Sequence, residues 1–144
     1  MQSDQTLLDA LATDTPLIDV RAPVEFNKGS FPRAVNLPIL NDEERAAVGT
    51  CYREQGHDAA VELGHQLVSG DLKEQRIRSW CDFQQNNPGA LLYCFRGGQR
   101  SELAAEWMQL AGYPVTRIEG GYKRLRNLLI DQLQVLPEKL DIVI

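Results

Sequence analysis

One thiol stands among residues whose types favour an anion. Cys94 opens the stretch CFRGGQRS, in which two adjacent glycines and two arginines follow closely. Glycines allow successive backbone N–H groups to converge on one point, and arginines add full positive charge. Such surroundings favour a thiolate over a thiol, and they would also stabilise an anion attached to the sulfur. We therefore predict that Cys94 is a nucleophile and that an anion-binding loop follows it, made of Phe95, Arg96, Gly97, Gly98, Gln99, Arg100 and Ser101.

The other cysteines and the histidines give weaker signals. Cys81 lies on the apolar side of a predicted helix, as a core residue would. Cys51 lies in a predicted loop, where it could take part as a second thiol. His57 and His65 have no acidic partner at metal-ligand spacing and are expected at the surface. There is no CxxC pair either, so the sequence predicts no metal site.

Two charged residues follow the first apolar run. Asp19 and Arg21 end the stretch TPLIDVR. They could point toward the same crevice as Cys94 and support its chemistry, or they could form a helix cap or a salt bridge. The sequence leaves both interpretations open.

The elements that must position Cys94 alternate along the chain. Apolar runs at 15–20, 90–95 and 114–119 predict buried strands, and helical patterns lie between and after them. Alternation of this kind is typical of an α/β domain with a mainly parallel sheet. Ligands of such sheets bind beyond the carboxyl ends of the strands, where loops lead into helices. Cys94 is predicted at such a strand end.

Capping patterns give the expected helix limits. Asn41 with Glu44 predicts a helix start, and Gly49 is its predicted end. Further helices are expected at about 58–68, with Val61, Gly64 and Val68 on one stripe, at 71–86 and at 122–133. Asp71 with Glu74 repeats the capping pattern for the helix at 71–86, in which Trp80 and Cys81 are expected to face inward. Residues 21–38 are expected to be mostly loop with a short extended piece, and residues 140–144 are expected to begin a buried strand. Ser101 is the predicted N-cap of a helix ending before Gly112, with its buried side formed by Leu103, Ala104, Trp107, Met108, Leu110 and Ala111.

Composition sets the class of protein. The 144 residues fit one domain, and 43% hydrophobic and 24% charged residues are typical of a folded protein. No run is apolar enough to cross a membrane, and no secretion signal opens the chain. Three cysteines without framework spacing favour a reducing cytoplasm. A net charge of -5 argues against nonspecific nucleic-acid binding, although residues 93–126 hold six basic and three acidic side chains.

Several motifs resemble those of rhodanese domains. The segment 19–26 matches [DE]-x-R-x-x-x-E-F, the segment 29–38 matches G-x-x-P-x-A-x-N-[LI]-P, and a cysteine loop and Gly120–Gly121 follow in the same order. Single-domain rhodaneses commonly carry C-x-x-G-x-R. Here five residues separate Cys94 from Arg100, so the loop is one residue longer.

The longer loop and the segment 41–68 resemble the N-terminal domain of the bacterial tRNA 2-selenouridine synthase family. The resemblance implies a rhodanese-like domain at 1–136 with an extra helical insertion at about 41–86. It also implies that residues 137–144 begin a P-loop domain that is absent from this chain. The family replaces the sulfur of wobble 2-thiouridine in tRNA with selenium from selenophosphate, through an S-geranylated intermediate.

The resemblance assigns roles as well. Cys94 would take up selenium as a perselenide or assist its delivery, and the loop would hold the anion. No cofactor would be bound by this domain, and geranyl diphosphate would bind to the P-loop domain. Lys123 and Arg124 could help to seat the tRNA.

Three other functions remain open. A thiosulfate or persulfide sulfurtransferase would use the same fold and nucleophile. C-x5-R is also the spacing of cysteine phosphatases, but residues 95–101 offer no carboxyl group as leaving-group acid. A docking module without catalysis would have no need to retain Cys94.

Overall fold

The computed structural model describes residues 2–96 and 98–139, with side chains described as far as residue 132. Four parallel strands form one sheet in the order β2-β1-β3-β4, namely β1 (Leu17–Asp19), β2 (Ala34–Asn36), β3 (Leu91–Tyr93) and β4 (Thr116–Arg117). The helices described are α1 (Asp4–Ala12), α2 (Pro23–Lys28), α3 (Asp42–Gln55), α4 (His57–Leu67), α5 (Gly70–Asn86), α6 (Gln99–Leu110) and α7 (Gly121–Lys139). The predicted α/β class with a parallel sheet is confirmed.

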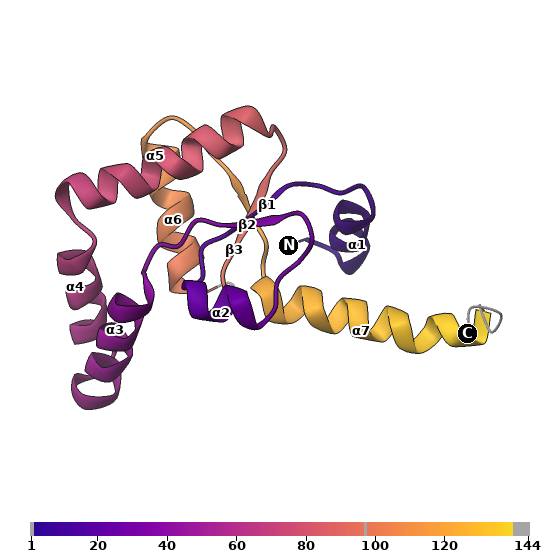
Figure 1. The fold of residues 1–144 in the computed structure, drawn as a ribbon, viewed down its shortest axis with the longest axis horizontal. Coiled ribbons are helices and arrows are strands. Elements are labelled where there is room, and N and C mark those ends of the chain that lie inside the picture. Colours follow the sequence, from indigo (N-terminus) through magenta and orange to yellow (C-terminus); the bar gives the residue numbers. More distant parts are fainter. Residues whose placement is uncertain (1, 97, 140–144) are drawn as a thin grey trace.

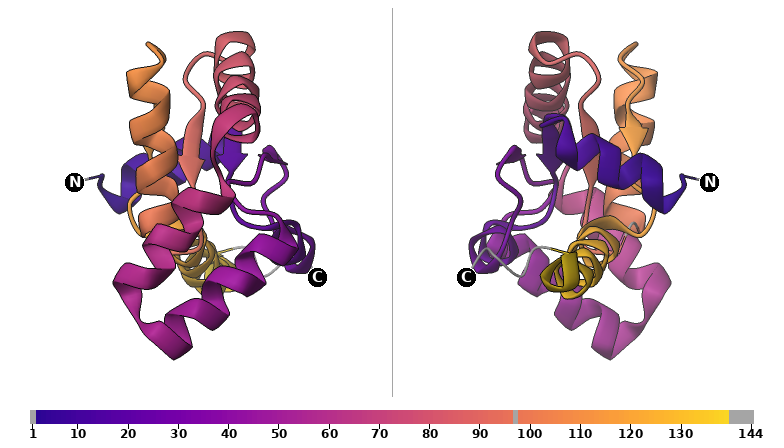
Figure 2. Two further views of the ribbon diagram at one scale, coloured as in Figure 1. Left: turned by 90° about the vertical axis from the view of Figure 1, so that its left-hand side faces the viewer. Right: turned by 90° about the vertical axis from the view of Figure 1, so that its right-hand side faces the viewer.

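Helices cover both faces of the sheet. Helices α5 and α6 pack on one face, and α1 and α7 lie on the other (Figures 1 and 2). One core cluster holds Ile18 and Leu92 with Trp80 and Met108 from the first pair of helices. The other cluster lies on the opposite face of the sheet and includes Leu7 of α1 and Leu125 of α7. This double covering is what a short parallel sheet requires, because neither of its faces can meet water.

Alternation along β3 decides where Cys94 points. Leu92 belongs to the core cluster under α5 and α6, whereas Tyr93 belongs to the cluster under α1 and α7. Cys94 follows the last residue of β3 and returns to the side of Leu92, because successive side chains of an extended chain face opposite ways. The thiol thus lies at the carboxyl end of a central strand, as predicted.

The segment between β2 and β3 is helical, in agreement with the predicted insertion at about 41–86. Asn41 caps α3 with the predicted box, since its Oδ1 accepts from the N–H of Glu44 and Glu44 Oε1 accepts from the N–H of Asn41. The predicted end at Gly49 is wrong, because α3 continues to Gln55. A glycine within a helix costs only about 1 kcal/mol, and the true end is Gly56, whose φ of 91° a side chain would disfavour.

Three local predictions need correction. Residues 23–28 form α2 and not a loop, with a proline in its first turn. Helix α6 begins at Gln99, so Ser101 is inside it and the N-cap is Gly98. Leu110 is 79% exposed, and Ala111 is exposed too, because the buried stripe of α6 runs through Ser101, Ala104, Trp107 and Met108.

Helix α5 is anchored by a buried indole. Ser69 and not Asp71 is its N-cap residue, and Trp80 donates from Nε1 to the carbonyl of Leu37 at 2.7 Å. The predicted inward position of Trp80 and Cys81 is confirmed.

Helix α7 extends to Lys139 and projects away from the sheet (Figure 1). The predicted strand at 140–144 lies outside the described residues, so the domain boundary after residue 136 stays a prediction. Among the described residues no helix is long and apolar enough to cross a membrane.

Candidate active site

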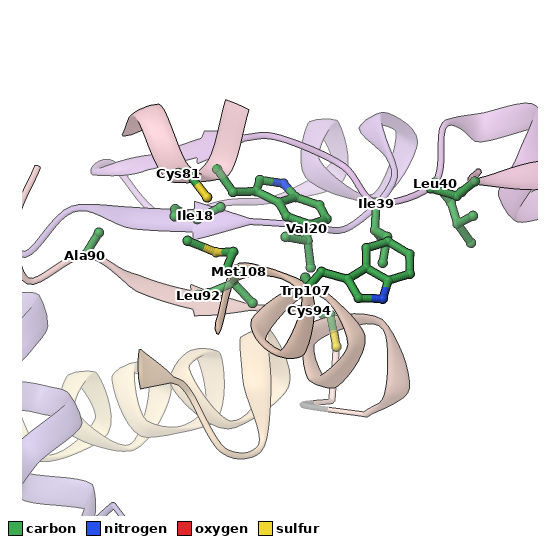
Figure 3. Close-up of a cluster of buried hydrophobic side chains, with 13 residues drawn as sticks. Ile18, Val20, Ile39, Leu40, Cys81, Ala90, Leu92, Cys94, Trp107 and Met108 are labelled. Carbon is green, nitrogen blue, oxygen red and sulfur yellow. The ribbon is translucent and has the colours of Figure 1, made fainter. Parts of the chain in front are cut away.

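Cys94 lies at the edge of the core and close to the start of α6. Its residue is 2% exposed and belongs to the same core cluster as Trp107 and Ile39 (Figure 3). Sγ is 3.2 Å from the hydroxyl of Ser101 and 3.9 Å from the carbonyl oxygen of Gly98. Among the described residues, the sulfur therefore contacts a hydroxyl and a carbonyl, and not the ring of loop N–H groups that the sequence suggested.

Ser101 connects the thiol to a cation. Its side chain is fully buried, donates to the carbonyl of Gly98 at 3.2 Å, and accepts from Nη1 of Arg117 at 3.5 Å. Nη1 of Arg117 donates to the Ser101 oxygen and so uses one of its lone pairs. The hydroxyl proton can turn either toward the carbonyl of Gly98 or toward the sulfur. When Cys94 is ionised, Ser101 can donate to it. Arg117 comes from strand β4 and is one of the six basic residues counted within 93–126, but local patterns did not connect it with Ser101.

The loop departs from its expected conformation. Gly98 has a φ of -88° and so does not use the positive φ open to glycine, while Gly97 lies outside the described residues. Arg96 is exposed, with its guanidinium 5.5 Å from the centre of the Phe95 ring. Arg96 is thus the loop arginine that remains exposed at the rim of the site.

Arg100 is committed to a carboxylate. Its Nη1 and Nη2 donate to the two oxygens of Glu25 at 2.5 and 3.2 Å, and Nε of Arg45 reaches the same carboxylate at 3.1 Å. Burial acts to raise the pKa of Glu25, but Arg100, the N–H of Ala22 and Arg45 outweigh it, so this pKa lies below its ordinary value. The pairing ties α2 and α3 to the first turn of α6. Arg100 therefore positions the loop in this structure instead of standing free for an anion.

Asp19 and Arg21 form a buried ion pair away from the thiol. Arg21 donates to Asp19 from Nε at 3.0 Å and from Nη2 at 2.7 Å, and Nη2 also reaches the carbonyl of Gly29 at 2.7 Å. The guanidinium lies 4.0 Å from the centre of the Tyr122 ring. Neither residue lines the pocket beside Cys94. Of the two interpretations left open, the salt bridge is correct, and their support of the site is structural.

A pocket of about 420 Å³ opens beside Cys94. The residues after β2, helices α3 and α4, the loop and helix α6 surround it. The predicted stripe of Val61, Gly64 and Val68 on α4 faces it, and the loop residues Phe95, Arg96, Gly98, Gln99 and Arg100 line it together with Leu103 and Trp107 of α6. The structure thus brings most of the described loop to one cavity, and it adds the α3–α4 hairpin, which sequence reasoning had not connected with the site.

The two histidines lie at the pocket beside Cys94, whereas Cys51 lies outside it. His57 and His65 are exposed, as predicted, yet both line the rim of the pocket, and Nε2 of His57 is 3.0 Å from Oε1 of Gln99. Cys51 lies inside α3 and not in a loop, and it lines a separate groove that shares no residue with the pocket. Among the described residues no group of three or more His, Cys, Asp or Glu side chains could hold a metal ion.

The arrangement suits transfer chemistry better than phosphate ester hydrolysis. A phosphatase needs a carboxylic acid to protonate the leaving group, and the described residues that line the pocket include no Asp or Glu. Glu102, the nearest carboxylate in sequence, is exposed in the first turn of α6. What the site offers is a buried thiol, one adjacent hydroxyl and an apolar cavity.

Comparison with known proteins places the chain among well-defined relatives. A family model for the rhodanese-like domain matches residues 3–128. A protein of Sulfurovum sp. (strain NBC37-1) named tRNA 2-selenouridine synthase is 58% identical over 126 residues, which are 88% of this chain and 35% of that protein. Its namesake in Nitrosomonas europaea (strain ATCC 19718 / CIP 103999 / KCTC 2705 / NBRC 14298) is 56% identical over 125 residues, covering 87% of this chain and 32% of that protein. The chain therefore spans about a third of the length of these relatives.

A solved structure has the same fold. It is the N-terminal domain of a protein from Clostridium difficile 630 that is described as an ATP/GTP binding protein. The two chains are 32% identical with a TM-score of 0.75, and the match covers 85% of this chain and 95% of the other.

Proposed function

This chain belongs to the rhodanese-like domain family, and from that premise we propose that it is the selenium-handling part of a tRNA 2-selenouridine synthase. The observation that carries the proposal is the identity of 58% and 56% to two proteins of that name, over almost nine tenths of this chain. The reaction would replace the sulfur of wobble 2-thiouridine with selenium from selenophosphate, by way of S-geranyl-2-thiouridine.

Substitution at the base is a polar reaction in which no redox cofactor takes part. In that exchange a bond forms between selenium and C2 of the base, the bond from C2 to sulfur breaks, and the sulfur leaves with its electron pair as geranyl thiolate. Selenium enters and leaves at the selenide level, so the exchange itself consumes no oxidant or reductant. As a carrier, the Cys94 thiolate would attack the selenium of selenophosphate to form a perselenide, and the electron pair of the broken P–Se bond would leave with phosphorus as phosphite. A thiol reductant would then release hydrogen selenide from the perselenide, itself becoming a disulfide. Alternatively, Cys94 would only assist the delivery of selenide.

The residues around Cys94 have separate roles in this proposal. Ser101 would donate to the ionised sulfur, while Arg117 donates to the oxygen of the same hydroxyl. Arg96, exposed at the rim, would meet the phosphate of selenophosphate. Arg100 and Glu25 would keep the loop in place.

The remaining partners belong to the whole protein. A following P-loop domain would bind geranyl diphosphate, and the C. difficile neighbour supports it, being the N-terminal domain of a protein described as ATP/GTP-binding. A separate groove is lined by Arg96, Lys123 and Arg124, together with the acidic Asp4 and Asp131. Its basic side chains could contact the tRNA backbone, although Arg124 is already paired with Asp4.

The first test is a chalcogen adduct on Cys94. The chain is incubated with selenophosphate and examined by intact-mass and peptide mass spectrometry, beside Cys94→Ser and Cys51→Ser. We expect an adduct of selenium on Cys94 in the parent and in Cys51→Ser, and none in Cys94→Ser. In the full-length protein, Cys94→Ser should abolish selenation of 2-thiouridine tRNA, because serine is a far weaker nucleophile than a thiolate.

A parallel incubation with thiosulfate separates the nearest alternative. Attack of the Cys94 thiolate on the outer sulfur would form a persulfide and release sulfite with the electron pair of the broken S–S bond. Rapid persulfide formation with no response to selenophosphate would favour a general sulfurtransferase and contradict the selenium assignment.

A further inference from the structure

The pocket beside Cys94 is apolar where an anion carrier would need charge. We propose that it binds an uncharged hydrocarbon chain carried by the substrate, and so holds that chain while the reacting atoms meet the thiol. The proposal rests on the proposed function in taking Cys94 as the reacting group and the geranyl group as the hydrocarbon chain.

The walls of the pocket set the chemistry of its occupant. Apolar side chains come from the residues after β2, from α3 and α4, from the loop and from α6, and the described lining includes no carboxylate; the apolar members are Ile39, Leu40, Val48, Ala60, Val61, Val68, Phe95, Leu103 and Trp107. An ion placed among these apolar groups, away from the arginines and histidines of the lining, would lose its hydration without finding a partner. A hydrocarbon chain would instead gain free energy with each carbon removed from water.

The size of the pocket suits a small ligand. Its volume of about 420 Å³ lies within the range of roughly 300–1,000 Å³ that small-molecule sites occupy. The cavity is bounded by α3, α4 and α6, three helices placed around the carboxyl ends of the strands (Figures 1 and 2).

The position of the sulfur excludes a permanent occupant. Cys94 lines the same pocket, so a protein segment lodged there would block the approach to the thiol. An occupant that arrives and leaves with the substrate avoids this conflict. Among the arginines of the lining, Arg45 and Arg100 are paired with Glu25, whereas the exposed Arg96 could meet a phosphate group of the same substrate. In the proposed reaction, the geranyl group is the substituent with this chemistry.

A filled pocket provides the test. Gly49 borders the cavity from within α3, and a Cβ added there would approach only Nη1 of Arg53, at 3.9 Å. In Gly49→Leu the new side chain has room to occupy the pocket, and leucine also favours the helix over glycine, so folding is not at risk. Ala47→Leu is the matched control, since it adds the same side chain two residues away, on the exposed side that lines the separate groove.

Binding is measured with geraniol, an uncharged prenyl alcohol, by tryptophan fluorescence and calorimetry in the Cys94→Ser background. We expect saturable binding that Gly49→Leu weakens by at least about tenfold, equal to about 1.4 kcal/mol, and that Ala47→Leu leaves unchanged. The absence of saturable binding, or equal binding by Gly49→Leu and the parent, would overturn the proposal.

Two comparisons distinguish a failure of this proposal from a failure of the proposed function. Because Cys94 is absent from the binding assay, failure of the selenium adduct does not affect the geraniol result. Binding by this chain that disappears in the full-length protein would assign the pocket to another segment of that protein, and would contradict the proposal.

Discussion

At the scale of single residues, Glu25 organises the loop after Cys94. Glu25 lies in α2, and its carboxylate binds Arg100 in the first turn of α6 and Arg45 on α3. The side chain is 12% exposed, so solvent screens these charges only in part. One carboxylate thus joins three helices at the mouth of the pocket.

Replacement of Glu25 should make the free energy of unfolding less dependent on pH. Glu25→Gln removes the charge that both arginines face, and we expect a loss of about 1–3 kcal/mol in the free energy of unfolding at neutral pH. Since the folded pKa of Glu25 lies below its unfolded value of about 4.3, its contribution is complete above that pH and is lost as the pH falls through the folded pKa. Urea unfolding between neutral pH and about pH 3 measures it.

The difference between the parent and Glu25→Gln should therefore be largest near neutral pH and should shrink below about pH 4. Glu62→Gln, at an exposed position of α4, serves as the control and should follow the parent at every pH. A difference that stayed constant down to pH 3 would show that the ion pairs add nothing to stability.

At the scale of elements, the α3–α4 hairpin makes one wall of the pocket. The two helices meet at Gly56, which is at once the C-cap residue of α3 and the N-cap residue of α4. Its φ of 91° and ψ of -177° are open to glycine and strained for other residues. The angle between the helices, and with it the shape of the pocket, depends on this residue.

Two glycine substitutions should act in opposite directions. Gly56→Ala forces a side chain into a strained backbone conformation and should lower the free energy of unfolding by about 1–3 kcal/mol. Gly49→Ala lies inside α3 and should raise it by about 0.5–1 kcal/mol, because alanine favours the helix. Thermal and urea unfolding measure both. Equal effects of the two variants would contradict the assigned end of α3.

At the scale of the whole molecule, the Asp19–Arg21 pair connects distant parts of the chain. Arg21 binds Asp19 at the end of β1 and the carbonyl of Gly29, and it lies against Tyr122 of α7. Asn36, at the end of β2, donates to the carbonyls of both Asp19 and Arg21. These contacts hold two neighbouring strand ends and α7 in one arrangement, at the edge from which the Cys94 loop departs.

Loss of one member of this pair should destabilise the whole domain. Arg21→Met leaves the buried carboxylate of Asp19 without its cation, and we expect a loss of about 3–5 kcal/mol in the free energy of unfolding. Asp19→Asn combined with Arg21→Met removes both charges and should recover part of that loss. Urea unfolding of the two single variants and the double variant tests this expectation. A double variant no more stable than Arg21→Met would show that the charge of Asp19 is not the cause.

Local patterns in the sequence were sufficient for the architecture and for the place of Cys94 at the end of a central strand. Apolar runs and capping pairs identified the strands beside Cys94 and the start of α3 at Asn41, because both depend on neighbours within a few residues. The same patterns failed at Gly49 and Ser101. A glycine can stay inside a helix at small cost, and a serine can serve as a hydrogen-bonding residue in the first turn instead of as a cap.

Only the tertiary structure decided which side chains surround the thiol. Arg100 meets Glu25 across 75 positions of sequence, Arg117 reaches Ser101 from another strand, and α3 and α4 close the pocket. No local pattern encodes these contacts, because each arises where separately formed elements pack at the carboxyl edge of the sheet. The sequence by itself therefore determined that Cys94 ends a central strand and precedes a helix. Packing decided that Arg100 is neutralised by Glu25 and that the cavity beside the thiol is apolar.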